Sequence, residues 1–144
     1  MTLYLDTSSL VKLYVAEPGS DVVRTLVDAA TIVATSSIAY TETRAALARR
    51  RRERVLRPTA FALAKKTFEA EWPKFLTIEV TSALCRQAGD FAEQYRLRAY
   101  DSMHLAAFAE VAREAGVPET RFSSFDNALN RAARSVRRTL TRAR

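Results

Sequence analysis

Two aspartates of this sequence lie where an α/β protein would place a reactive group. Asp6 directly follows a β-rich run at residues 2–5, and Asp126 directly follows a second such run at residues 121–125. In an open parallel sheet, ligands bind beyond the carboxyl ends of the strands, at the point where the strand order reverses. If these two strands flank that point, the two carboxylates face each other across the site.

Two further acids interrupt the apolar faces of predicted helices. Glu42 follows Ile38 by four residues and precedes Ala46 by four, so the three side chains share one helix face. Asp101 begins an apolar stripe that continues with Leu105. An acid that faces a protein core must be paired, protonated or bound to a cation. Glu42 and Asp101 are therefore candidates for the same site.

Together, the four carboxylates predict a site for a divalent cation. Crowded carboxylates repel one another and raise each other's pKa values, whereas Mg²⁺ or Mn²⁺ accepts several oxygen ligands at once. The chemistry that such a site supports is metal-assisted attack of water on a phosphodiester. Each acid also has an ordinary structural interpretation. Asp101 and Asp126 could begin helices, whereas Asp6 could form a local turn. Glu42 could reach solvent or pair with an arginine.

Strands and helices alternate along the chain, which predicts a parallel sheet with helices on both faces, a three-layer α/β/α fold. β-branched and apolar runs indicate the strands, and helical spacing bounded by caps, prolines and Gly116 indicates the helices. The predicted strands cover residues 2–5, 31–35, 75–80 and 121–125, with a fifth at 136–140. The predicted helices cover residues 8–15, 20–29, 37–52, 58–72, 82–95, 99–115 and 127–133.

The composition is that of one ordinary globular domain, for which we take residues 1–144. Hydrophobic residues make up 48% of the chain. No apolar run approaches the roughly 20 residues of a membrane helix, and no signal-cleavage pattern follows the first residues. We therefore expect a cytoplasmic protein with no membrane partner. One cysteine and one histidine exclude an internal disulfide and a histidine-based zinc cluster.

Basic residues outnumber acidic ones by 23 to 16, which gives a net charge of +7, and they gather in two places. One cluster holds six arginines between Arg49 and Arg57. The other, between residues 127 and 144, holds six arginines and no acid. Such clusters suit a polyanion such as RNA, whose phosphates release counterions on contact. A solvated helix face and a frayed terminus would give the same pattern.

The four acids lie in motifs whose order resembles that of the PIN-domain family, in particular the VapC-type toxin ribonucleases of bacterial toxin–antitoxin pairs. The motifs are DTSSLVKLY from Asp6, SSIAYTETRAAL around Glu42, AYDSMHLAAFA around Asp101 and FSSFDNAL around Asp126. A single D-x-S triplet is common by chance. Four motifs in this order, each on the expected element, cover nearly the whole chain.

This resemblance implies a fold and a set of site residues. The fold would be a parallel sheet of strand order 3-2-1-4-5 between helices. Asp6, Asp101 and Asp126 would hold Mg²⁺ or Mn²⁺, and Glu42 would help to bind it or position the attacking water. Two serines, Ser8 and Ser124, would orient the carboxylates, although a turn or cap role explains these serines equally well. We expect His104 to pack beside the site, and Tyr100 and Phe125 to lie in the core.

The resemblance further implies a metal-dependent endoribonuclease, the toxin of a type II pair. Its substrate would be RNA, its partner a small antitoxin protein, and its assembly a homodimer. One departure concerns the C-terminus. The family often has a glycine before its last strand, where this chain reads AARSVRRTL. This leaves open whether residues 135–144 form a last strand followed by a frayed basic tail.

Two other classes of protein are alternatives. A phosphatase-like or receiver-like α/β protein also places acids at strand ends. A haloacid-type phosphatase would need D-x-D after its first strand, where this chain has Asp6, Thr7 and Ser8, and a receiver would need an adjacent acidic pair there. A non-catalytic RNA-binding module would keep the fold without the chemistry, and the four intact acids argue against it.

Overall fold

In a computed structural model of the chain, which describes residues 1–143, four parallel strands form one central sheet. The strands are β1 (Thr2–Leu5), β2 (Ile32–Ser36), β3 (Leu76–Ile78) and β4 (Thr120–Ser123). Their order in the sheet is β3-β2-β1-β4. The chain therefore leaves β1 in one direction toward β2 and later returns on its other side to form β4, so the predicted point of reversed strand order lies between β1 and β4.

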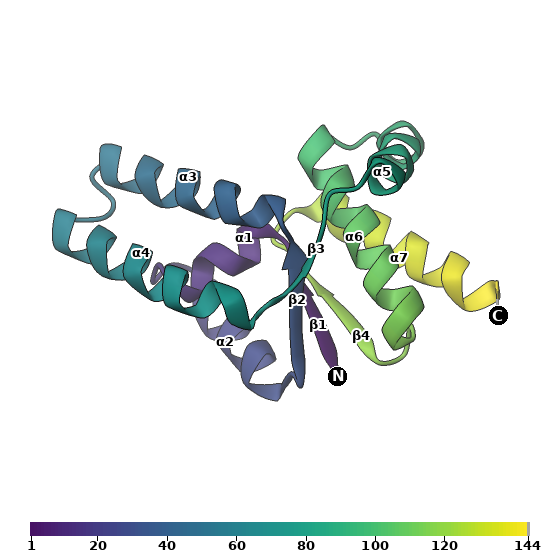
Figure 1. Cartoon of the computed structure of the whole chain (residues 1–144), viewed down its shortest axis with the longest axis horizontal. Coiled ribbons are helices and arrows are strands. Elements are labelled where there is room, and N and C mark those ends of the chain that lie inside the picture. The colour runs from purple at the N-terminus through teal and green to yellow at the C-terminus, as the bar shows by residue number, and fades with distance from the viewer. Residues whose placement is uncertain (144) are drawn as a thin grey trace.

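Helices cover both faces of this sheet (Figure 1). Those before β3 are α1 (Thr7–Leu10), the 3-10 helix η1 (Val11–Leu13), α2 (Ser20–Ala29), α3 (Ile38–Arg52), α4 (Pro58–Glu71) and η2 (Trp72–Lys74). Those after β3 are α5 (Ser82–Tyr95), α6 (Ala99–Ala115) and α7 (Asn127–Arg142). Figure 1 shows α1 to α4 on one side of the sheet and α5 to α7 on the other, which confirms the predicted three-layer α/β fold.

The alternation of side chains along β1 divides the core between the two layers. Leu3 and Leu5 pack with residues of α1 to α4, and Tyr4 between them packs with Leu105 and Leu129 of α6 and α7. All residues of β1 are buried, as expected of a central parallel strand with helices on both faces. Because β1 is packed on both faces, Asp6 at its carboxyl end has a defined position.

The prediction of a fifth strand at residues 136–140 is wrong, because these residues continue α7 to Arg142. The buried side chains of α7 are Leu129, Ala132, Ala133 and Val136, whose spacing is that of one helix face. No glycine or proline interrupts residues 127–142, so nothing stops the helix at residue 133. The basic tail is thus helical rather than frayed up to Arg142, and Arg144 lies outside the described residues.

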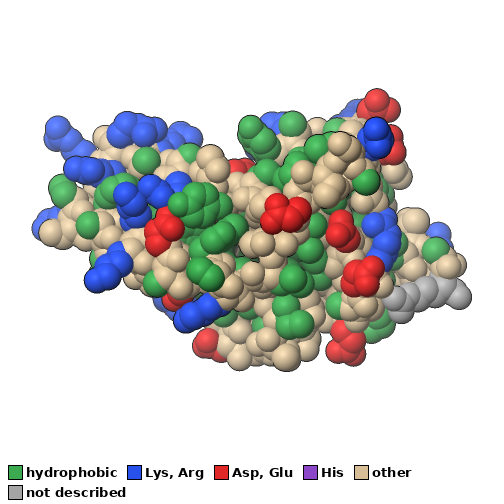
Figure 2. All heavy atoms as spheres, viewed as in Figure 1, with side chains coloured by type: hydrophobic (Ala, Val, Ile, Leu, Met, Phe, Trp, Pro, Cys, Tyr) green, Lys and Arg blue, Asp and Glu red, His purple; other side chains and the backbone are tan. Residues whose placement is uncertain are grey.

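The first basic cluster lies on the pair of helices α3 and α4, which we call the α3/α4 arm. Figure 2 shows Lys and Arg side chains gathered over this arm. Several of them are neutralised: Arg49 pairs with Glu53 at 2.9 Å and Arg50 with Glu17 at 3.2 Å.

Across residues 1–143, no helix combines the length and the apolar character that a membrane span requires.

Candidate active site

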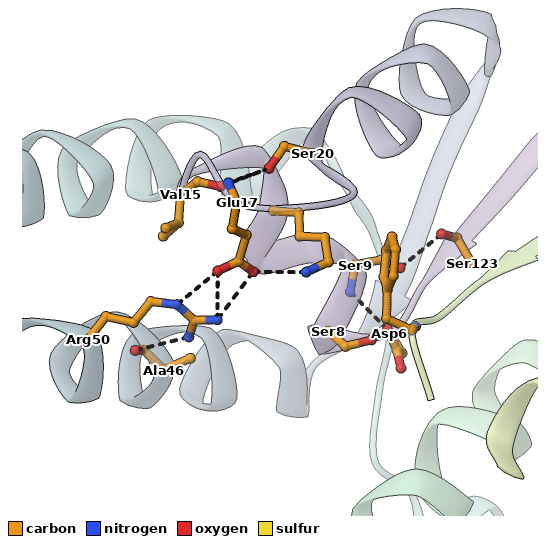
Figure 3. Close-up of polar contacts among 11 residues, drawn as sticks. Asp6, Ser8, Ser9, Val15, Glu17, Ser20, Ala46, Arg50 and Ser123 are labelled. Carbon is orange, nitrogen blue, oxygen red and sulfur yellow. Dashed lines mark hydrogen bonds and ion pairs between the residues drawn. The ribbon is translucent and has the colours of Figure 1, made fainter. Parts of the chain in front are cut away.

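Asp6 lies at the carboxyl end of β1 and is almost completely buried. Its Oδ1 accepts hydrogen bonds from the Ser9 amide at 3.0 Å and the Ser8 hydroxyl at 2.7 Å, so Asp6 caps α1 (Figure 3). Its Oδ2 accepts from the Ser124 hydroxyl at 2.5 Å. The Asp6 amide donates to the Ser123 carbonyl at 3.1 Å. Both carboxylate oxygens are therefore held, one by donors from α1 and the other by the residue that follows β4.

The two serines predicted to support the site both contact Asp6, and each makes a second bond. The Ser8 hydroxyl also accepts from the Phe125 amide at 2.9 Å, and the Ser124 hydroxyl accepts from the Asp126 amide at 3.0 Å. The bond between Ser8 and Phe125 joins α1 to the turn after β4, and the bond between Ser124 and Asp126 lies within that turn. Ser124 thus joins the backbone of one candidate acid to the carboxylate of another.

Asp126 is the N-cap residue of α7, and Asp101 lies in the first turn of α6. The Asp126 carboxylate caps α7 by accepting from the Leu129 amide at 2.7 Å. Burial raises the pKa of Asp101, and the negative charges of Asp126 and Asp6 raise it further, against the opposing effect of the exposed Arg98 at 3.5 Å. The structure therefore brings Asp6, Asp101 and Asp126 within electrostatic range of one another.

Glu42 is held in a different way, on the second turn of α3. Its Oε1 accepts from the Thr7 hydroxyl at 2.7 Å and lies 2.8 Å from Nε2 of His104. Burial opposes the charge on Glu42, but the hydrogen bonds from His104 and Thr7 outweigh it and lower the pKa of Glu42. Glu42 is thus an ionised carboxylate with one oxygen bound by protein donors.

His104 is buried and engaged at both ring nitrogens, beside the site as expected. Nδ1 lies 2.8 Å from the hydroxyl of Tyr4, and Nε2 contacts Glu42. With Glu42 ionised, the network assigns the ring proton to Nε2, and Nδ1 accepts from Tyr4. Burial, followed by the charges of Asp6 and Glu42, raises the pKa of Tyr4, so this hydroxyl keeps its proton and remains a donor.

The sequence analysis did not predict the hydrogen-bonded network of Tyr4, His104 and Glu42, although part of the pattern that indicates it was present. His104 follows Asp101 by three residues and therefore lies on the same side of α6. The hydrogen-bond partners of His104 could not be predicted from the sequence, because Tyr4 and Glu42 reach its ring only through the tertiary fold. Thr7 was missed as a donor to Glu42 for the same reason.

Two aromatic side chains expected in the core are exposed instead. Tyr100 precedes Asp101 and is 63% exposed, and Phe125 precedes Asp126 and is 45% exposed. The amino group of Lys12 lies 4.5 Å from the centre of the Phe125 ring. Phe125 precedes the N-cap of α7, so it does not belong to the helix whose apolar face packs in the core.

The donor set fits a hard divalent cation in kind. All four candidate ligands are carboxylates. Burial is the main cause of the raised pKa of Asp101, and the repulsion from Asp126 and Asp6 that adds to it is the effect that a bound cation would relieve. The four carboxylates do not converge on one point: among residues 1–143, no group of three or more Asp, Glu, His or Cys side chains is arranged as a metal site. The ligands would have to converge for all to contact one ion.

Comparison with known proteins adds to this geometry. Residues 3–135 match the PIN domain family, a range that includes all four acids and both serines. The chain belongs to the PIN domain family.

Two curated relatives of this PIN domain come from Mycobacterium tuberculosis: Ribonuclease VapC45 of strain CDC 1551 / Oshkosh and Ribonuclease VapC49 of strain ATCC 25618 / H37Rv. Each is 35% identical to this chain over 105 residues, which cover 73% of the chain and 73% of the relative. The resemblance to the PIN family and to its VapC-type members, inferred from the four motifs, is thereby confirmed. The match to the family ends at residue 135, inside α7.

Proposed function

We propose that this PIN domain is a metal-dependent endoribonuclease and the toxin of a type II toxin–antitoxin pair. The observation that carries the proposal is the electrostatic coupling of Asp101 to Asp126 and Asp6 at the carboxyl edge of the sheet. Membership of the PIN family and two relatives that bear the name ribonuclease support the same function. RNA as substrate is consistent with the net charge of +7.

In this proposal, Asp6, Asp101 and Asp126 hold Mg²⁺ or Mn²⁺, and Glu42 contributes to the same site. The bound ion would supply charge neutralisation for the phosphodiester and a lowered pKa for water. Ser8 and Ser124 keep the carboxylate of Asp6 in one orientation through their hydrogen bonds.

The remaining chemistry falls to Glu42, whose Oε1 is occupied by Thr7 and His104. Its other oxygen would orient the attacking water or accept its proton. The lowered pKa keeps Glu42 ionised, so its free oxygen can accept a hydrogen bond from the water; because it also makes Glu42 a weaker base, it favours orientation of the water over removal of its proton. His104 and Tyr4 hold Glu42 in place and need not touch the RNA.

We propose the partners by analogy with the relatives. A small antitoxin would bind this chain, and the active assembly would be a homodimer in the cytoplasm, where RNA substrates and the antitoxin are available. Co-expression with the protein encoded beside it, followed by co-purification and measurement of the mass of the complex in solution, tests both partners.

The decisive experiment is cleavage of total cellular RNA by the purified protein with Mg²⁺ or Mn²⁺ and with chelator. We expect metal-dependent fragments that disappear in Asp6→Asn and Asp101→Asn. Asp21→Asn is the matched control, because the Asp21 side chain is fully exposed on α2, and it should cleave as the parent does. Cleavage that survives in chelator or in the two site variants would contradict the assignment. RNA binding without cleavage by the folded parent would indicate a non-catalytic RNA-binding module.

A further inference from the structure

The exposed face of α7 carries basic residues with no acid to neutralise them. Arg134, Arg138 and Arg142 are exposed and are separated by four residues each, so they follow one another along one face of the helix. Residues 127–143 contain no acid. Within the part of the chain that the structure describes, these three arginines form no ion pair, unlike Arg49 and Arg50 of the α3/α4 arm.

This helix lies along β4, the edge strand of the sheet. The amide of Thr2 donates to the carbonyl of Glu119, and the amide of Asp6 donates to the carbonyl of Ser123. Along a parallel strand, alternate residues direct their backbone N–H and C=O groups to the same side. The backbone groups of residues 120, 122 and 124 therefore face away from β1. Side chains of α7 occupy two of these outward carbonyls. Arg137 donates to Thr120, and Asn130 donates to Ser124 at 2.9 Å. A further strand therefore could not add to this edge without displacing both bonds.

Two hollows in the protein surface lie beside α7 and are lined in part by its side chains. One, of about 310 Å³, is lined by Arg121, Phe122, Asn130, Arg134 and Arg137 among others. The other, of about 410 Å³, is lined by Val117, Arg138 and Arg142 and shares Arg134 and Arg137 with the first. Because they share two arginines, the hollows are adjacent and together make a basic, indented surface along α7. We call it the α7 groove, defined by Arg121, Arg134, Arg137, Arg138 and Arg142.

We infer that the α7 groove holds the phosphate backbone of a single-stranded RNA whose neighbouring segment lies at the acidic site. This inference rests on the proposed ribonuclease function. Asp126 caps α7, so the helix starts at the site, and Arg134 follows about 12 Å further along the helix axis. Arginines in a groove bind phosphates as charged donors, and the occupied edge of β4 disfavours a peptide that adds as a strand. The exposed Phe125 ring beside Asp126 gives a base a surface on which to stack.

The test compares two sets of substitutions that each remove three positive charges. Arg134→Ala, Arg138→Ala and Arg142→Ala are combined in one variant of the α7 groove. The matched control combines Arg52→Ala, Arg57→Ala and Lys66→Ala, all exposed on the α3/α4 arm. Binding of a fluorescent single-stranded RNA is measured by anisotropy over a range of salt concentrations, in chelator, so that no metal-dependent cleavage occurs. Thermal melting checks that both variants are folded.

We expect the α7 variant to lose at least about tenfold in affinity at low salt, and the slope of log K against log salt to fall by about 2, at roughly 0.7 for each lost phosphate contact. The control should stay within about twofold of the parent. Equal losses in both variants, or none in the α7 variant, would overturn the inference. Competition by polyglutamate as strong as that by RNA would overturn it in favour of an acidic protein partner.

If the parent cleaves RNA but α7 proves unimportant for binding, the groove is refuted and the ribonuclease stands. If the α7 variant alone loses binding but the parent cleaves nothing, the groove stands and the ribonuclease fails.

Discussion

Asp101 and Glu42 both interrupt the apolar face of a helix, yet their surroundings act on them in opposite directions. Burial and the charges of Asp126 and Asp6 raise the pKa of Asp101. Burial also acts on Glu42, but hydrogen bonds from His104 and Thr7 outweigh it and lower the pKa of that carboxylate. The protein therefore stabilises the charge on Glu42 by itself, whereas the charge on Asp101 is opposed by its neighbours.

This difference separates two roles within one group of acids. A carboxylate that protein donors already satisfy has a fixed orientation and suits the positioning of water. A carboxylate that is crowded by other carboxylates gains most from an external cation. These two roles are tested by substitution of each acid and then of the groups that hold it.

The largest effect is expected for Asp101→Asn. We expect RNA cleavage to fall by about 10²–10³-fold, because one of the groups proposed to hold the metal is lost. The free energy of unfolding at neutral pH and in chelator should stay the same or increase, since the substitution removes a buried charge that its neighbours repel. Cleavage rates and urea unfolding of the same samples test both parts. A large loss of stability would show that Asp101 is held by favourable contacts instead.

The next effect concerns the group that holds Glu42. His104→Ala removes one of the two groups that bind Glu42 Oε1 and the ring nitrogen that contacts the buried Tyr4 hydroxyl, so we expect a loss of about 2–4 kcal/mol in the free energy of unfolding. His104→Gln keeps a side-chain donor toward Glu42 and should recover part of both stability and cleavage. Denaturant unfolding measures the effect. Equal behaviour of the two variants would show that the hydrogen bond to Glu42 contributes nothing.

The two acids should also give stability a pH dependence of opposite sign. The folded-state pKa of Glu42 is lowered, so its contribution is present above the unfolded pKa of about 4.3 and is lost as the pH falls through the folded value. The folded-state pKa of Asp101 is raised, so its contribution is present below the unfolded pKa of about 3.9 and is lost as the pH rises through the folded value.

Urea unfolding between pH 3 and pH 7 in chelator separates these contributions in the variants. Glu42→Gln should lose less stability than the parent on acidification. Asp101→Asn should lose less stability than the parent as the pH rises from the acid end. If both substitutions change the profile in the same direction, the contrast between the two carboxylates is not real.

The smallest effect is expected for the serines that hold Asp6. Ser124→Ala removes the bond to Asp6 and the acceptor for the Asp126 amide, so cleavage should fall by about tenfold. Ser135→Ala on α7 is the control, since the Ser135 hydroxyl contacts Tyr95 at 3.5 Å and lies outside the proposed site. A steady-state cleavage assay on a defined RNA distinguishes them. Unchanged cleavage in Ser124→Ala would limit this serine to a turn role.

Local sequence patterns were sufficient to predict the parallel α/β architecture and the strand ends that carry Asp6 and Asp126. These features depend on local patterns: buried strands, helical spacing and motif order. The same local information placed Glu42 and Asp101 on apolar helix faces. The family followed from the order of the four motifs, because each motif is contiguous in the chain.

How these residues are held depends on contacts that form when the chain folds. His104 meets Tyr4 and Glu42 across elements that are far apart in the sequence. The helix that replaces the predicted fifth strand is stabilised by packing of its apolar face against the sheet and α6, which a short β-like run at residues 136–140 could not reveal. The sequence already showed one acid, Glu53, inside the first basic cluster and none in the second. Helical spacing brings Glu53 to Arg49, whereas Glu17 reaches Arg50 through the tertiary fold, because ion pairing depends on distances in space and not on the count of charges in the chain.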